Sequence, residues 1–246
     1  MTDHHKTALT QSAYPIYIDV GMNIGWFSLW ALALNATTYS FEPNPINRMR
    51  YCESLALNGI SHDQAHLFAA GVGAEPANLT LAYKGNNPGA GTLRQNARGN
   101  HRFHNIPVVR LDDVAEQERW LDVDSPSIDL LKIDTEGFEP PVIFGAPKLI
   151  ASRKVRNIML EYSCEITPER DMKRLTNRLV NAGYKLSSIG RFNGGIMTGM
   201  AEKITAINPD NATEGIDDRL HAFCWSHASK QLNLWWKLDH DFRATK

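Results

Sequence analysis

The sequence has little of what a disulfide-bonded, metal-binding or membrane-spanning protein needs. Its three cysteines, Cys52, Cys164 and Cys224, lie far apart and form no CxxC pair. This spacing argues against a disulfide framework and against a cysteine zinc site, and it predicts three small buried side chains in a reducing, cytoplasmic protein. No apolar run reaches the roughly 20 residues that cross a bilayer, so no membrane span is expected.

A surplus of basic residues is missing as well. The chain has 26 lysines and arginines against 27 acidic residues, which gives a formal net charge of -1. Such a balance disfavours nucleic acid as a partner, although Arg94, Arg98, His101 and Arg102 give one segment a local basic character. Internal repeats and low-complexity tracts are lacking too, and the length of 246 residues suits one large α/β domain.

Strand-like and helix-like segments alternate along most of the chain. The predicted strands are residues 16–20, 38–41, 66–72, 128–133, 157–161, 184–189 and 220–225. The predicted helices are residues 24–35, 46–57, 113–120, 140–152 and 168–183, followed by a terminal helix that contains Trp235 and Trp236. This alternation is typical of an α/β protein with a doubly wound, mostly parallel, seven-stranded sheet.

Three regions interrupt the alternation. Residues 1–15 are polar and are expected to be a disordered lead-in to a single domain over residues 16–246. Turn-rich sequence between the third and fourth strands predicts a β-hairpin insertion over about 78–110, whose glycine-rich run 85–92 is either a gate or a surface turn. The C-terminal segment 190–246 is largely irregular in pattern.

The carboxyl ends of the strands carry the residues that suggest a ligand site, because ligands of open α/β sheets bind there. The first strand runs directly into Asp19-Val20-Gly21-Met22-Asn23-Ile24-Gly25, and the second ends in Glu42. Gly21 and Gly25 permit a tight strand-to-helix turn that a ligand can approach closely. An acid at the position of Glu42 can accept both hydroxyls of a ribose. The pattern therefore predicts an adenosine-like ligand.

Two details favour S-adenosylmethionine over a dinucleotide. The dinucleotide fingerprint needs glycine at the first, third and sixth positions, and counting from Gly21 the third is Asn23 and the sixth is Trp26. Asp19 lies just before the turn, where a carboxylate would repel a pyrophosphate but suits a cationic ammonium or sulfonium group. The alternative is that Asp19 is a buried structural acid that holds loop amides.

Four blocks of sequence resemble the FkbM-family methyltransferases. They are Asp19 to Gly25, Phe41-Glu42-Pro43-Asn44-Pro45, Leu111-Asp112-Asp113, and the most specific one, Asp129 to Glu139. The resemblance runs from about Tyr17 to Tyr162 and implies a class I, Rossmann-like methyltransferase. It also implies S-adenosylmethionine as cofactor, and O-methylation of a small molecule, natural product or carbohydrate. The expected cofactor-binding residues are Asp19, Gly21, Asn23, Gly25, Glu42, Pro43, Asn44 and Gly71.

Three acids at the ends of adjacent strands, Asp134, Glu136 and Glu161, are the predicted catalytic residues. Together they can attract a sulfonium and accept a hydroxyl proton, and their mutual repulsion would raise the pKa of one of them. The alternative for Glu136 is that it caps the next helix and shapes the loop. Glu139 is expected to be a solvated or structural charge. Lys132 is expected to point away from the active end as a structural partner.

Other interpretations of the same residues stay open. Three carboxylates can hold Mg²⁺, although no metal is predicted here. A catalytically inactive adenosine-binding module would not need the acids Asp134, Glu136 and Glu161, an NAD oxidoreductase is opposed by Asn23 and Trp26, and a nucleic-acid methyltransferase is opposed by the neutral charge. The acceptor and the oligomeric state are not specified by the sequence.

Overall fold

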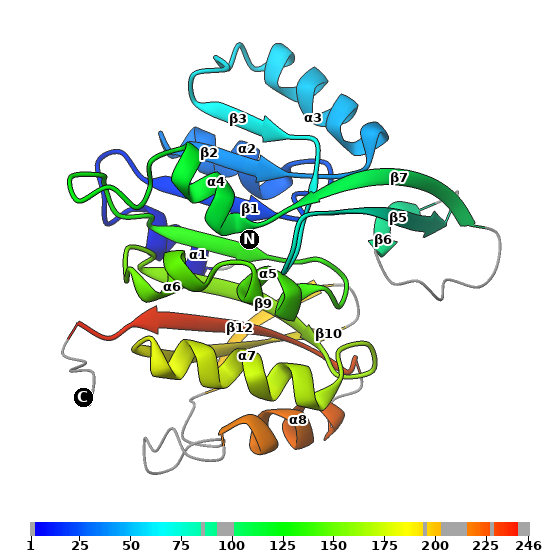
Figure 1. Ribbon diagram of the computed structural model, residues 1–246, viewed down its shortest axis with the longest axis vertical. Coiled ribbons are helices and arrows are strands. Elements are labelled where there is room, and N and C mark those ends of the chain that lie inside the picture. The colour runs from blue at the N-terminus through cyan, green and yellow to red at the C-terminus, as the bar shows by residue number, and fades with distance from the viewer. Residues whose placement is uncertain are drawn as a thin grey trace.

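A central sheet with helices on both faces forms the body of the protein (Figure 1). The computed structural model describes residues 3–84, 87–92, 101–193, 196–202, 216–226 and 229–240. The strands of the sheet are β1 (Ile16–Val20), β2 (Thr37–Phe41), β3 (Ala65–Phe68), β8 (Leu130–Ile133), β9 (Asn157–Ser163), β10 (Tyr184–Asn193), β11 (Ile196–Glu202) and β12 (Gln231–Leu238). Their spatial order is β11-β10-β12-β9-β8-β1-β2-β3.

The direction of the strands confirms the mostly parallel sheet. Strand β1 pairs in parallel with β2 and β8, β2 with β3, and β8 with β9. Strand β12 is antiparallel to both of its neighbours, β9 and β10, and β11 extends the seven-stranded arrangement at one edge. The order reverses between β1 and β8, so the carboxyl ends of these strands border the crevice where a ligand of such a sheet binds.

The helices divide between the two faces of the sheet. They are α1 (Asp3–Leu9), α2 (Trp26–Ala33), α3 (Pro45–Leu57), α4 (Leu111–Gln117), α5 (Glu139–Phe144), α6 (Pro147–Ala151), α7 (Glu169–Asn181) and α8 (Ile216–Ser226). Helices α4 to α8 bury the face that carries Ile18, Leu131 and Leu160. Helices α1 and α2 bury the opposite face, which carries Tyr17 and Met159. Among the described residues, no helix is both long and apolar enough to cross a membrane.

The C-terminal third differs from the prediction. The segment expected as the seventh strand, residues 220–225, belongs to helix α8, whose buried Leu220 and Cys224 lie one turn apart on the same face. The segment expected as a terminal helix is instead strand β12, in which Trp235 packs into the core on one side of the sheet and Trp236 into the core on the other. Part of the region expected to be irregular is strand β11.

The expected insertion is part of a second, four-stranded sheet with the order β4-β7-β5-β6. Its strands are β4 (Gly71–Val72), β5 (Ala77–Lys84), β6 (Asn87–Thr92) and β7 (His101–Val109). Strands β5 and β7 are antiparallel, as a hairpin requires, but β6 and β4 add to their outer edges. Most of the glycine-rich run is therefore strand rather than loop, while residues 85–86 and 93–100, with Arg94 and Arg98, lie outside the described residues. The gate stays a prediction.

Two further expectations are corrected near the N-terminus and at the cysteines. Residues 3–9 form helix α1, not a disordered lead-in, because Ala8 and Leu9 are buried against α2. Cys164 and Cys224 form a disulfide between the end of β9 and α8, with a Cα–Cα distance of 6.1 Å, and Cys52 is exposed. The partners are 60 residues apart in sequence, so spacing alone could not reveal them. The cytoplasmic location stays a prediction, and the cysteines do not support it because two of them are paired.

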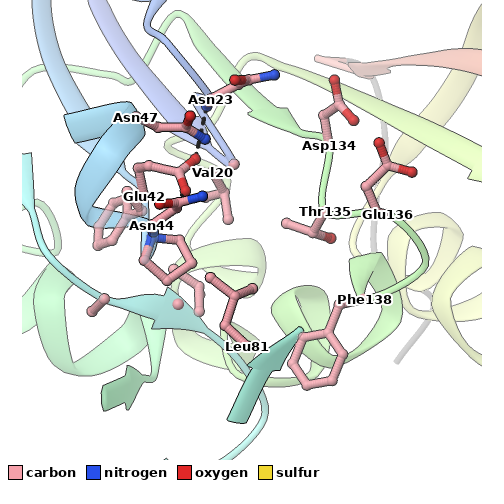
Figure 2. Close-up of a pocket in the computed structure, with 16 residues that line it drawn as sticks. Val20, Asn23, Glu42, Asn44, Asn47, Leu81, Asp134, Thr135, Glu136 and Phe138 are labelled. Atoms are coloured by element: carbon pink, nitrogen blue, oxygen red, sulfur yellow. Dashed lines mark hydrogen bonds between the residues drawn. The ribbon is translucent and has the colours of Figure 1, made fainter. Parts of the chain in front are cut away.

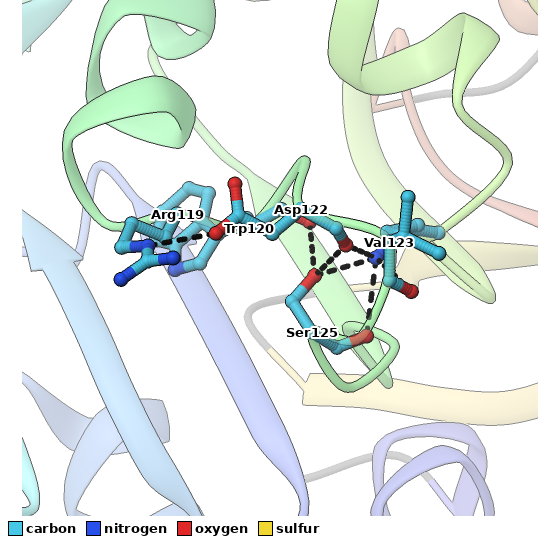
Figure 3. A network of polar contacts seen from close by, with 6 residues as sticks. Arg119, Trp120, Asp122, Val123 and Ser125 are labelled. Atoms are coloured by element: carbon cyan, nitrogen blue, oxygen red, sulfur yellow. Dashed lines mark hydrogen bonds and ion pairs between the residues drawn. The ribbon is translucent and has the colours of Figure 1, made fainter.

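A compact polar turn closes the opposite, amino end of β8 (Figure 3). The hydroxyl of Ser125 lies 2.7 Å from the carbonyl oxygen of Trp120 and 2.8 Å from that of Asp122. The ammonium of Lys154 contacts the carbonyl oxygens of Asp122 and Ser125. These contacts satisfy backbone groups of the connection between α4 and β8, far from the carboxyl ends that carry the candidate site.

Candidate active site

One cavity lies at the carboxyl ends of β1, β2 and β8, and the second sheet borders it (Figure 2). Eight of the predicted site residues line it: Gly21, Asn23, Glu42, Pro43, Asn44, Gly71, Asp134 and Glu136. The sequence reasoning missed several others, namely Asn47, Leu81, Thr135 and Phe138. Leu81 comes from strand β5, and only the fold of the second sheet brings it to this place. Thr135 lies between the predicted acids Asp134 and Glu136, and Phe138 follows Glu136 by two residues, a signal that could have identified them.

Glu42 is fixed at one end of the cavity by backbone amides. Its carboxylate accepts hydrogen bonds from the N–H of Asn23 (2.9 Å) and of Asn44 (2.8 Å), and the side chain is almost fully buried (Figure 2). Burial raises the pKa of Glu42 to about 7, although both amides favour the charged form. Each carboxylate oxygen has a second lone pair, so Glu42 can still accept hydroxyl groups of a ligand in the cavity.

The glycine turn after β1 has a conformation that few other residues adopt. Gly21 has φ of +79°, and a Cβ added there would lie 1.9 Å from the carbonyl oxygen of Asp134. Gly25 has φ of +82°, and its added Cβ would collide with the ring of Tyr51. Gly21 therefore lets the turns after β1 and β8 meet at the cavity. Gly25 instead permits helix packing, and it is absent from the described cavity lining.

Asp19 lies beneath the turn and not in the described cavity lining. Its fully buried carboxylate accepts a hydrogen bond from the Ser28 hydroxyl (2.7 Å) and pairs with the Lys132 ammonium (3.3 Å). The structure therefore places Asp19 as a buried acid, held by a hydroxyl and an ammonium rather than by loop amides. Lys132 does not point away from the active end as expected, since its ammonium also lies 3.3 Å from Asp134.

The predicted catalytic acids meet at the other end of the cavity. One carboxylate oxygen each of Asp134, Glu136 and Glu161 lies within 4.8 Å of the others. Burial, followed by repulsion from Asp134 and Glu136, raises the pKa of Glu161 to about 9. Burial and Asp134 also raise the pKa of Glu136. Glu161 is outside the described cavity lining but belongs to this cluster, and its raised pKa favours the protonated form in the free protein.

Glu139, rather than Glu136, shapes the loop between β8 and α5. The Glu139 carboxylate accepts hydrogen bonds from the N–H of Thr135 (2.9 Å) and of Gly137 (3.1 Å). It is 2% exposed, and burial raises its pKa to about 7, so it is a structural acid but not a solvated one. Glu136 has φ of +54° and Gly137 has φ of +93°, and this left-handed pair turns the chain beside the cluster. Figure 2 shows Asp134 and Glu136 on neighbouring parts of this turn.

The strand order and the cavity together define a Rossmann-like α/β protein of the methyltransferase type. Seven strands follow the order β3-β2-β1-β8-β9-β12-β10, with β12 reversed, and the cavity lies between a glycine turn and a buried acid. The chain belongs to the FkbM methyltransferase family, because the model of the methyltransferase FkbM domain matches residues 19–186.

Comparison with individual proteins gives more distant matches. Methyltransferase sdnD of Sordaria araneosa is 29% identical over 185 residues, which cover 65% of this chain and 71% of that protein. A methyltransferase FkbM of Methylobacillus flagellatus KT is 17% identical with a TM-score of 0.48, over 75% of this chain and 41% of that one. A precorrin-6y C5,15-methyltransferase of Geobacter metallireducens GS-15 is 12% identical with a TM-score of 0.46, over 96% of this chain and 88% of that one.

Proposed function

We propose that this protein transfers a methyl group from S-adenosylmethionine to a hydroxyl oxygen of a small molecule, natural product or carbohydrate. Membership of the FkbM family supports methyl transfer. The observation that carries the proposal is that one cavity joins the buried acceptor Glu42 to the acids Asp134 and Glu136. Glu42 suits the hydroxyls of a ribose, and the two acids suit a cation that reacts with a hydroxyl.

The residues of the cavity fit S-adenosylmethionine in three respects. Glu42 is buried, oriented by two amides and able to accept further hydrogen bonds. Gly21 and Gly71 leave backbone exposed to the cavity without a side chain. Pro43, Asn44 and Asn23 would complete the surface around the nucleoside. When bound, the cofactor supplies a methyl group on a sulfonium, which departs as the neutral thioether S-adenosylhomocysteine.

The protein's own contribution is positioning and proton acceptance. Holding two reactants in line can contribute about 7–11 kcal/mol to lowering a barrier. A base within reach of the hydroxyl typically adds about 10²–10⁴-fold in rate. Burial and the neighbouring acids give Glu161 a high proton affinity in the free protein. A cationic ligand bound beside it favours loss of that proton. We therefore assign the ionised Glu161 carboxylate as the acceptor of the hydroxyl proton, with Asp134 and Glu136 attracting the cationic centre.

Calorimetry with S-adenosylhomocysteine and NADH tests the proposal. The wild-type protein should bind S-adenosylhomocysteine and not NADH. Glu42→Ala should weaken that binding several-fold or more, because it removes the buried carboxylate and leaves two backbone amides unpaired. Glu53→Ala is the matched control, since Glu53 is an exposed acid on α3. Binding of NADH alone would contradict the proposal and favour an oxidoreductase.

A second measurement separates an enzyme from an inactive binding module. Release of S-adenosylhomocysteine is followed while candidate alcohols and sugars are supplied with S-adenosylmethionine. Methyl transfer to a hydroxyl supports the proposal, whereas cofactor binding with no transfer to any hydroxyl acceptor supports the module. The same assay with EDTA shows whether the acids act without a divalent cation, as proposed.

A further inference from the structure

Lys132 occupies the row of side chains directly beneath the acid cluster. On strand β8 it lies in register with Asp19 of β1 and with Met159 of β9. Its side chain is buried, and its ammonium stands 3.3 Å from Asp19 Oδ1 and 3.3 Å from Asp134 Oδ2. The ammonium also lies 5.2 Å from the centre of the Phe27 ring of α2. One buried cation therefore contacts both a structural carboxylate and a carboxylate of the proposed reaction site.

A continuous polar chain extends from this ammonium under the glycine turn. Asp19 Oδ2 accepts a hydrogen bond from the Ser28 hydroxyl at 2.7 Å, and the Ser28 hydroxyl oxygen lies 2.9 Å from the hydroxyl oxygen of Ser40. All members of the chain except Asp134 are fully or almost fully buried. Ser40 is on β2, and Glu42 directly follows this strand, so the polar chain connects the strands that lead to the two ends of the cavity. Buried networks of this kind hold their members in one geometry.

A purely structural role for Lys132 does not explain its contact with a second carboxylate, that of Asp134. A buried ammonium needs one carboxylate for charge balance, and Asp19 already supplies it. Asp134 is partly exposed at the cavity, where water could solvate it without a cation. Although burial alone would lower it, the pKa of Lys132 is raised by Asp134 and Asp19, so the ammonium stays charged.

Other ionisable groups around the cluster are mostly acidic. From the elements packed there they are Tyr17 and Asp19 of β1, Tyr51 of α3, Glu136 and Glu139 of the turn and α5, Glu161 of β9, and His5 of α1, which stacks on Phe27. The positive charge of Lys132 opposes the negative charge of these acids, and it lowers the proton affinity of both Glu136 and Glu161.

We propose that Lys132 is a positioning residue, whose ammonium holds the Asp134 carboxylate at the cavity and offsets the negative charge around Glu161, so that the ionised Glu161 carboxylate can take the acceptor's proton. The hydroxyl proton passes to the Glu161 carboxylate and from there to solvent. Asp134 stays beside the Lys132 ammonium and attracts a cationic centre. This division of roles rests on the proposed function, but its electrostatic part is a property of the protein without any ligand.

Carbon-13 NMR of the side-chain carboxyls, titrated in the ligand-free protein, tests the inference. Lys132→Met keeps most of the side-chain volume and removes the charge. We expect the titration of Glu161 to move upward by about one pKa unit or more, since the variant removes the positive charge that lowers the proton affinity of Glu161. Lys148→Met is the matched control, because it removes an exposed lysine that pairs with Glu116.

A second pair of variants protects the test against misfolding. Lys132→Met leaves Asp19 buried without its cation, which can unfold the protein. In the Asp19→Asn variant, residue 19 carries no charge that needs a buried cation. Comparing this variant with the double variant Asp19→Asn/Lys132→Met therefore measures the effect of the Lys132 ammonium alone. An unchanged Glu161 titration in both comparisons would overturn the inference and leave Lys132 as a structural partner of Asp19.

Cofactor binding separates this inference from the proposed function. The ratio of the dissociation constants of S-adenosylhomocysteine and S-adenosylmethionine is measured against pH in the same variants. The cationic ligand should gain affinity over the neutral one as the cluster loses its proton, and loss of Lys132 should shift that transition upward. If neither ligand binds the wild-type protein, the proposed function fails, while the carboxyl titration still decides the role of Lys132.

Discussion

Replacing Glu161 by glutamine should make the protein more stable while it removes the proposed proton acceptor. Burial and the neighbouring acids raise the pKa of Glu161 to about 9, well above that of an unfolded glutamate. The folded state therefore favours the protonated carboxyl. When the pH exceeds the unfolded pKa, folding must either add a proton to Glu161 or bury its negative charge, and both make folding less favourable. Glutamine has nearly the same shape as protonated glutamic acid and carries no charge at any pH.

The sign of the effect follows from proton linkage. A raised folded pKa gives stability that is complete below the unfolded pKa of about 4.3 and is lost as the pH rises through the folded value. For Glu161 the loss extends from about pH 4.5 to about pH 9. Because the three acids titrate together and the side chain is partly solvated, we expect a gain of about 1–3 kcal/mol at pH 7 to 8 for the amide.

Urea unfolding at pH 5, 7 and 8.5 measures this gain. The free energy of unfolding of Glu161→Gln should exceed that of the wild type by more at pH 8.5 than at pH 5, while methyl transfer falls. Glu165→Gln is the control, because Glu165 is an exposed acid that follows the same strand. Equal pH slopes for the wild type and Glu161→Gln would refute the argument that Glu161 carries a raised pKa in the folded protein.

Four further predictions follow from the site. Asp134→Asn and Glu136→Gln should each weaken the affinity for the cationic S-adenosylmethionine, with little change in the affinity for neutral S-adenosylhomocysteine, because each removes a carboxylate that attracts the cationic centre. Calorimetry with both ligands measures this, and an unchanged affinity for S-adenosylmethionine in both variants would refute the assignment. Glu42→Gln should instead weaken S-adenosylhomocysteine binding in calorimetry, with a smaller effect on saturated turnover. Gly21→Ala should destabilise the protein by roughly 2 kcal/mol or more in urea unfolding, because of its positive φ and the clash with Asp134. Thiol titration of the folded, unreduced protein should find one reactive group, Cys52, and three would contradict the disulfide.

The first half of the fold could be predicted because its local signals agree with one another. Strand 16–20 is a short buried run between a proline and a glycine, and the structure has it at the same residues. Glu42 and Asp134 could be placed in one cavity because parallel strands bring their carboxyl ends to the same edge of the sheet. These inferences need only the order of the elements and their direction.

The C-terminal half needed information that local sequence does not hold. The apolar run 220–225 is too short for its periodicity to separate a strand from a helix, and it is helix α8. Trp235 and Trp236, expected in a terminal helix, pack on opposite sides of strand β12. The disulfide of Cys164 and Cys224 depends on where α8 docks, which spacing along the chain does not encode.

Within the site, residue types could be predicted more readily than their roles. Lys132 precedes Asp134 by two residues, so simple strand alternation puts both on one face, and the ion pair between them follows from it. The loop-shaping role suggested for Glu136 belongs to Glu139, because the left-handed backbone at Glu136 ends the alternation. Backbone reversals of this kind depend on what the turn packs against, such as Ile166 beside Gly137.

A crystal structure of the protein with S-adenosylhomocysteine tests the central claim most directly. The account predicts that the ribose hydroxyls bond to the Glu42 carboxylate and that the sulfur faces the cluster of Asp134, Glu136 and Glu161. The backbone of Gly21 should lie against the ligand. A ligand bound elsewhere, or bound in this cavity with its sulfur at the Glu42 end, would contradict the account.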